Sequence, residues 1–93
     1  MEEWSSYYER GLAALKSGDL DTAVAELEEA SRRQNDYRVF NALGAAYASK
    51  GLYEKAIGAF KAAEQLAPDV AKTHYNIGQA YEAVGIYLSL IHI

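Results

Sequence analysis

The sequence predicts an all-α fold in which antiparallel helix-turn-helix units of one kind stack into a short α-solenoid. Three observations carry this prediction. Glycines recur at a fixed spacing, since Gly11, Gly44 and Gly78 are 33 and 34 residues apart. Apolar residues recur every three or four positions, which is the period of one helix face. The chain is rich in alanine and has a single proline, a composition that favours helices.

We expect five helices, near residues 3–17, 20–34, 37–50, 53–66 and 70–84. The first helix of each unit carries the recurrent glycine within its apolar stripe, as in Phe40-x-x-Leu43-Gly44-x-x-Tyr47. A glycine inside a helix costs roughly 1 kcal/mol relative to alanine. Its recurrence in spite of that cost indicates that a partner helix approaches closely at this position.

The ends of the helices follow from a second set of recurrent residues. Gly18, Gly51 and Gly85 each lie seven positions after a first glycine, and Gly51 stands where a helix commonly ends in a left-handed residue. The second helix of the middle unit opens at Tyr53 and ends before Pro68, which cannot continue a helix. Its inner stripe is Ala56, Phe60 and Ala63, and Asp19 and Asp69 are expected as N-caps.

The middle unit, 37–70, closely resembles the tetratricopeptide repeat at Leu43, Gly44, Tyr47, Gly51, Tyr53, Ala56, Phe60, Ala63 and Pro68. A more divergent repeat at about 4–36 and a partial one at 71–87 complete a single array over residues 1–87. The resemblance implies a right-handed superhelix. It also implies that Tyr47, Tyr53, Tyr81 and Tyr87 belong to the core, and that His74, at the position of Tyr7 and Phe40, lines it.

The repeat pattern stops after Tyr87. Residues 88–93, Leu-Ser-Leu-Ile-His-Ile, resemble the translation of a sequencing-adapter end, so we expect a non-native or disordered tail; a natural divergent C-terminus is the alternative. The helix at 70–84 would then lack its covering partner, leaving Ile77, Tyr81 and Val84 partly exposed. Such a face could support weak self-association.

The chain contains no motif for most classes of catalytic or metal-binding chemistry. It contains no cysteine, no Gly-x-Ser-x-Gly sequence, no phosphate-binding loop and no histidine pair at metal-ligand spacing. We therefore expect no enzyme, no cofactor and no metal, and interpret the run Glu26, Glu28, Glu29 as a solvated face. The net charge of −4 argues against a nucleic-acid partner. No apolar stretch reaches the roughly 20 residues that span a membrane, and the polar N-terminus favours a cytoplasmic protein.

The resemblance implies that the first helix of each unit lines a concave groove that binds a peptide or protein segment, as in a non-catalytic adaptor or scaffold. The residues expected in this groove are Tyr8, Arg38, Asn41, Lys72, Tyr75, Asn76 and Gln79. An extended peptide with a carboxylate near Arg38 and Lys72 is the expected ligand. The carboxylate clamp of one chaperone-binding subfamily is not supported, because of its five positions Lys72 alone agrees.

Two alternatives remain open from the sequence. The chain could be a structural spacer or self-association segment of a longer repeat protein. It could also be the repeat region of a larger enzyme or regulator whose catalytic part lies elsewhere.

Overall fold

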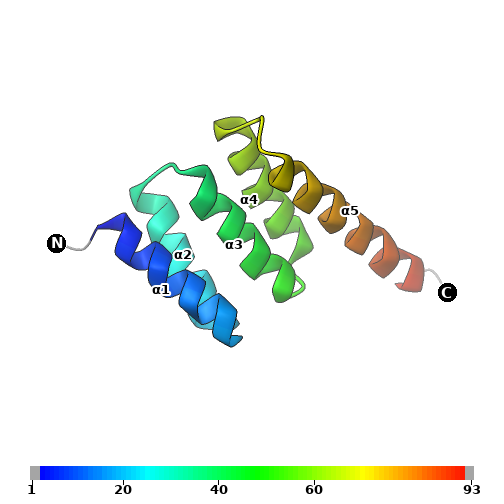
Figure 1. Cartoon of the computed structure of the whole chain (residues 1–93). Coiled ribbons are helices and arrows are strands. Elements are labelled where there is room, and N and C mark those ends of the chain that lie inside the picture. The colour runs from blue at the N-terminus through cyan, green and yellow to red at the C-terminus, as the bar shows by residue number, and fades with distance from the viewer. Residues whose placement is uncertain (1–2, 92–93) are drawn as a thin grey trace.

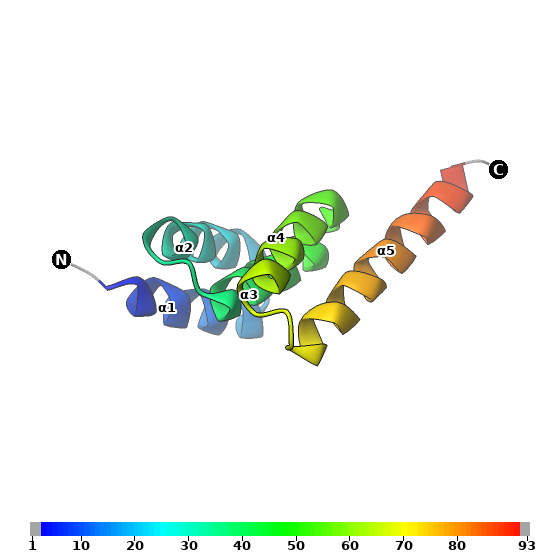
Figure 2. The same ribbon diagram turned by 90° about the horizontal axis from the view of Figure 1, so that it is seen from above.

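A computed structural model describes the backbone of residues 3–91 and the side chains of residues 3–85. Its helices are α1 (Trp4–Ser17), α2 (Leu20–Arg33), α3 (Tyr37–Ser49), α4 (Tyr53–Leu66) and α5 (Ala71–Ile91), and this part of the chain contains no strand. The pairs α1–α2 and α3–α4 follow one another, with α2 and α4 on one side of the array and α1 and α3 on the other (Figures 1 and 2). The predicted all-α repeat fold is confirmed.

The recurrent glycines allow close packing within each pair of helices. A Cβ atom added to Gly11 would lie 2.5 Å from Leu27 Cγ on α2. A Cβ atom added to Gly44 would lie 2.5 Å from Cδ1 and 2.8 Å from Cζ of Phe60 on α4. Since carbon atoms prefer separations of about 3.5–4.0 Å, each glycine leaves the space that its partner's large side chain occupies.

The turns between paired helices repeat as predicted. Gly18 and Gly51 have φ angles of 86° and 79°, the left-handed conformation that glycine adopts without steric cost. The Asp19 side chain accepts a hydrogen bond from Thr22 N at 3.3 Å and so caps α2. Asp69 does not cap α5, because the extra residue Val70 stands between it and the first helical residue.

The two complete repeats are joined by packing and by polar contacts. Leu27, Phe60 and the alanines around them are buried in a common core. The Tyr47 hydroxyl on α3 donates a hydrogen bond to the Glu28 carboxylate on α2. Lys50, which follows α3, forms an ion pair with Asp21 at 2.5 Å. These contacts fix the second repeat against the first.

The fifth helix is longer than predicted, because it ends at Ile91 and not near residue 84. Gly85 lies inside it and has no positive φ angle, unlike Gly18 and Gly51. Left-handed glycine is needed where the chain turns back to pack on the preceding helix, and no helix follows α5 among the described residues. The backbone of residues 88–91 thus continues the helix, and residues 92–93 of the expected tail lie outside the described part.

Among the described side chains, none covers the face of α5 that carries Gly78 and Tyr81, and α5 leads away from the α3–α4 pair (Figure 2). Nothing lies within 4 Å of a Cβ atom added at Gly78, the position equivalent to Gly44. Tyr81 is 49% exposed, so its assignment to the core was wrong. The expectation that Ile77, Tyr81 and Val84 are partly exposed is confirmed, since Ile77 and Val84 are half-buried. The position of Tyr81 becomes part of the core when a further helix packs on this face of α5.

His74 was predicted to line the core. The same open face explains why it does not. Its imidazole is half-exposed and turns toward the α4–α5 connection. The Nε2 atom lies 2.7 Å from the Pro68 carbonyl oxygen, and Nδ1 lies 3.0 Å from a carboxylate oxygen of Glu64. His74 therefore fastens the start of α5 to the end of α4.

Candidate functional site

A groove with a volume of about 390 Å³ lies where α1, α3 and α5 meet on one side of the array. It brings together five of the seven predicted residues, which are Tyr8, Arg38, Asn41, Lys72 and Asn76. The rest of its lining consists of Leu12, Leu15, Tyr37, Ala42, Ala45 and Val70. The groove is therefore apolar along α1 and more polar along α3 and α5.

The two remaining predicted residues lie outside this groove. Tyr75 is 64% exposed, and its hydroxyl accepts a hydrogen bond from Gln79 Nε2 at 2.9 Å. Gln79 lines a second depression, described below. Tyr75 lines neither hollow, because its ring stands out from α5 into solvent.

Arg38 is a cation with a partner already in place. Its Nη2 and Nε atoms donate to the two carboxylate oxygens of Asp36 at 2.7 and 3.0 Å, and its guanidinium lies 5.8 Å from the centroid of the Trp4 ring. The hydrogen bonds from Arg38 hold the pKa of Asp36 below its usual value, and the Asp36 carboxylate raises the pKa of Arg38. A ligand carboxylate at Arg38 therefore has to compete with Asp36.

Lys72 is the groove cation that is open to a ligand. It lies at the start of α5, is exposed, and forms no ion pair with a carboxylate of residues 3–85. A flexible ammonium group of this kind can follow a ligand carboxylate over several ångströms. Of the two groove cations, Lys72 is therefore the one without a carboxylate partner among residues 3–85.

Asn41 connects the two helices that form the groove wall. Its Nδ2 atom donates a hydrogen bond to Thr73 Oγ1 at 2.9 Å, and Thr73 is completely buried. The Asn41 Oδ1 atom is buried without a hydrogen-bond partner among the described residues. Thr73 was missed by the sequence reasoning, although a signal existed: the equivalent position in the middle repeat is the buried Val39, so a hydroxyl there needs a partner.

A second depression, of about 470 Å³, lies beside the groove and shares Ala45 and Asn76 with it. Small and aromatic side chains from α3, α4 and α5 form most of its surface, and three polar side chains border it. Its lining residues are Ala45, Ala48, Tyr53, Phe60, Asn76, Gln79, Ala80, Glu82 and Ala83. We call it the α3–α5 depression; the sequence did not predict it.

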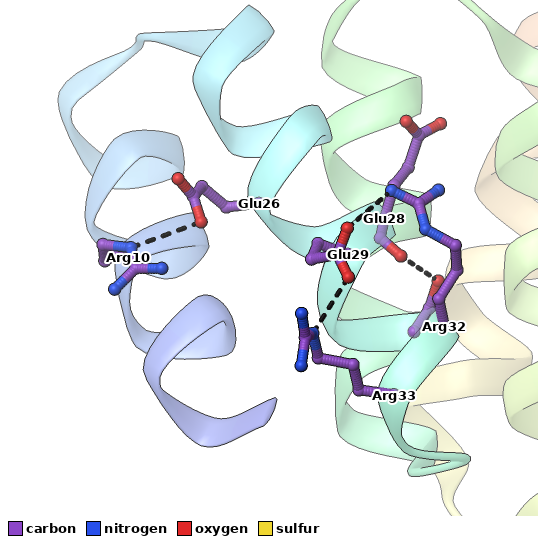
Figure 3. Close-up of polar contacts among 7 residues, drawn as sticks. Arg10, Glu26, Glu28, Glu29, Arg32 and Arg33 are labelled. Carbon is purple, nitrogen blue, oxygen red and sulfur yellow. Dashed lines mark hydrogen bonds and ion pairs between the residues drawn. The ribbon is translucent and has the colours of Figure 1, made fainter. Parts of the chain in front are cut away.

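The acidic run of α2 was expected to be a solvated face, but its carboxylates also form ion pairs within the fold. Glu26 forms an ion pair with Arg10 at 3.3 Å, and Glu29 forms ion pairs with Arg32 at 3.0 Å and Arg33 at 2.9 Å. Figure 3 shows these side chains turned toward one another. These hydrogen bonds lower the pKa of Glu29. The arginines of α2 therefore have carboxylate partners within the fold, and none of this cluster lines either hollow.

The described residues form neither a metal-binding cluster nor a membrane-spanning helix. They contain no group of three or more His, Cys, Asp or Glu side chains placed to hold a metal ion. In the same part of the chain, no helix has the length and apolar character required to cross a membrane.

Comparison with known proteins agrees with the geometry of the repeats. Residues 8–71 match the family profile of the tetratricopeptide repeat. The chain is 35% identical over 97 aligned positions to superkiller complex protein 3 of Homo sapiens and 33% identical over 90 to that of Mus musculus, with 96% of the chain covered in each case. Tetratricopeptide repeat protein 37 of Xenopus laevis is 31% identical over 91 positions and 97% of the chain.

The chain spans about 6% of the length of these relatives. Repeats of this kind generally mediate interactions between proteins. With more than half of the chain matched and the paired helices, glycine contacts and left-handed turns in place, the protein belongs to the tetratricopeptide repeat family.

Proposed function

We propose that this chain is a non-catalytic binding module that holds an extended segment of another protein in the groove between α1, α3 and α5. The observation that carries the proposal is the groove itself, which is lined by Lys72 and Asn76 of α5 together with Asn41 of α3. Lys72 supplies a positive charge that forms no ion pair with the side chains of residues 3–85, and the half-buried Asn76 amide one turn further along α5 can bond to a peptide backbone. Two of the relatives are named as proteins of a complex, which supports a role in protein association.

Selection from a random peptide library displayed on phage tests this proposal. The full chain should enrich a family of related peptides, and the triple variant R38A/N41A/K72A should not. The matched control K16A/K55A removes two exposed lysines outside both hollows and should enrich the same peptides as the unchanged chain. Circular dichroism confirms that each variant is folded. Equal enrichment by the triple variant would show that the groove is not the binding surface.

A second candidate, weak self-association through the open face of α5, is favoured by one observation. Gly78 and the exposed Tyr81 present an apolar strip that no helix covers within the described residues. A second copy of the chain could bury this strip against its own α5. Sedimentation velocity over a range of protein concentrations tests the idea: association should appear in the unchanged chain and disappear in Y81K. A monomer at millimolar concentration contradicts it.

A further inference from the structure

The two repeats differ in bulk at equivalent positions along the groove. Leu12 and Leu15 of α1 correspond to Ala45 and Ala48 of α3, 33 residues later in each case. The two leucines lie along the groove between α1 and α3, whereas the two alanines border the α3–α5 depression. The depression therefore exists where the second repeat lacks the side chains that the first repeat has.

The α3–α5 depression has the surface that a bulky apolar side chain requires. Its inner wall includes Phe60, which is 3% exposed, and Ala80, which is 4% exposed. The residues of the open α5 face, Gly78 and Tyr81, do not line it, so a further helix packed on that face would leave the depression open. The depression is therefore open to a side chain of a ligand.

The charges at the two ends of the combined surface are opposite. Lys72 lines the groove at the N-terminal end of α5, and Glu82 borders the depression nearly three turns further along. An acidic residue of a ligand is attracted at the Lys72 end and repelled at the Glu82 end. The charge arrangement therefore fixes which part of a ligand is acidic.

The helix geometry sets the spacing between these two ligand groups. Lys72 and Ala80 are eight residues apart in α5, which corresponds to about 12 Å at 1.5 Å per residue. An extended peptide rises about 3.3 Å per residue, so about four residues cover this distance. Side chains four positions apart in an extended segment point to the same side.

We propose that the groove selects an extended segment in which an acidic residue, bound at Lys72, is separated by four positions from a leucine or phenylalanine that fills the α3–α5 depression. This inference rests on the proposed function and adds the chemistry and the spacing of the ligand. Asn76, which lines both hollows, lies where the peptide backbone passes between the two side chains.

Nuclear magnetic resonance titration of the ¹⁵N-labelled full chain with synthetic peptides tests the proposal. The peptides are Gly/Ser segments with blocked ends that contain one Glu and one Leu, separated by two to six positions and in both orders. A separation of four should bind most tightly in one order. Replacement of its Leu by Ala should weaken binding about tenfold, since a buried leucine contributes that much or more.

Two variants separate the two parts of the site. A48L fills the depression and should abolish the preference for Leu while the preference for Glu remains; K72A should do the reverse. A25L, the same substitution at an exposed position of α2, is the matched control and should bind as the unchanged chain does. Equal affinity at all separations, an unaffected A48L variant, or no binding by any peptide would overturn the inference. Library-selected peptides that bind the groove but lack the spaced Leu would overturn it and leave the proposed function standing.

Discussion

Substitution of the recurrent glycines by alanine gives a direct test of how the helices pack. Gly44, Gly58 and Gly78 all lie within helices, and each gains up to about 1 kcal/mol in helix propensity when alanine replaces it. They differ in what the new methyl group meets. At Gly44 it would lie 2.5 Å from Phe60 Cδ1, whereas at Gly58 and Gly78 nothing lies within 4 Å.

The expected change in the stability of G44A follows from the crowding at Phe60. A contact of 2.5 Å is about 1 Å shorter than carbon atoms tolerate, and the Phe60 ring is 3% exposed, so it has no free space to enter. Crowding of this kind in a packed core costs about 1–3 kcal/mol. G44A should therefore lose about 1 kcal/mol of stability after its gain in propensity, while G58A and G78A should gain up to about 1 kcal/mol.

Urea denaturation followed by far-ultraviolet circular dichroism measures these differences. Comparison of G44A with G58A cancels the propensity term and leaves the cost of crowding, which should be about 2 kcal/mol. If G44A is as stable as G58A, the glycine does not serve close helix approach. If G78A is destabilised, the α5 face is covered in solution, contrary to the structure.

Three further predictions concern single contacts. Burial, together with the hydrogen bond to Glu28, raises the pKa of Tyr47 to about 12. Its neutral phenol therefore stabilises the fold below pH 10, and this contribution is lost as pH rises through 12. Ultraviolet absorbance titration should show one late-ionising tyrosine that Y47F lacks. The Asp36 side chain also caps α3, since it accepts a hydrogen bond from Arg38 N at 2.8 Å, so D36A should lose about 1 kcal/mol at neutral pH. The hydrogen bonds from Arg38 lower the pKa of Asp36, so the gap between D36A and the unchanged chain should close as pH falls below the ordinary value of 3.8, and a gap that persists in acid contradicts this. G51A should lose about 1–2 kcal/mol in the same denaturation assay because the φ angle there is 79°, and an unaffected midpoint would contradict the left-handed turn.

The fold could be predicted from the sequence because its determinants are local and repeated. Periodic apolar positions and spaced glycines set α1 to α4, which begin and end within one residue of the predicted bounds. The errors concentrate on α5. The positions of His74, Tyr81 and Gly85 acquire their usual roles through contact with a following helix, and none packs there in the described structure.

The candidate site could be predicted in outline but not in its energetics. Superposing the repeats identifies which positions face the groove, so Asn41 and Lys72 were predicted to lie in it. The pairing of Arg38 with Asp36 depends on side-chain conformations that no periodic pattern specifies. The buried bond from Asn41 to Thr73 joins residues 32 positions apart and depends on how two repeats dock.

Differences between the repeats, set against their shared pattern, show where the surface departs from a uniform array. The positions that hold paired helices together stay alike, as with Leu27 and Phe60, both of which fill the space above a glycine. The row of equivalent positions Leu15, Ala48 and Glu82, which lines first the groove and then the α3–α5 depression, changes from bulky to small to charged. A row that varies in this way does not serve a uniform core, and its variation leaves a hollow of about 470 Å³.

A double variant that makes the first two repeats alike at these positions tests this inference. A45L/A48L gives the second repeat the side chains of the first, and the added apolar groups would cover part of the depression. Because a buried leucine contributes about 1.5–3 kcal/mol relative to an exposed one, partial burial should stabilise the fold by about 1 kcal/mol. Binding of peptides that carry the spaced Glu and Leu should weaken at the same time. Loss of stability would show that the depression is closed in solution, whereas a gain in stability with unchanged binding would place the ligand elsewhere.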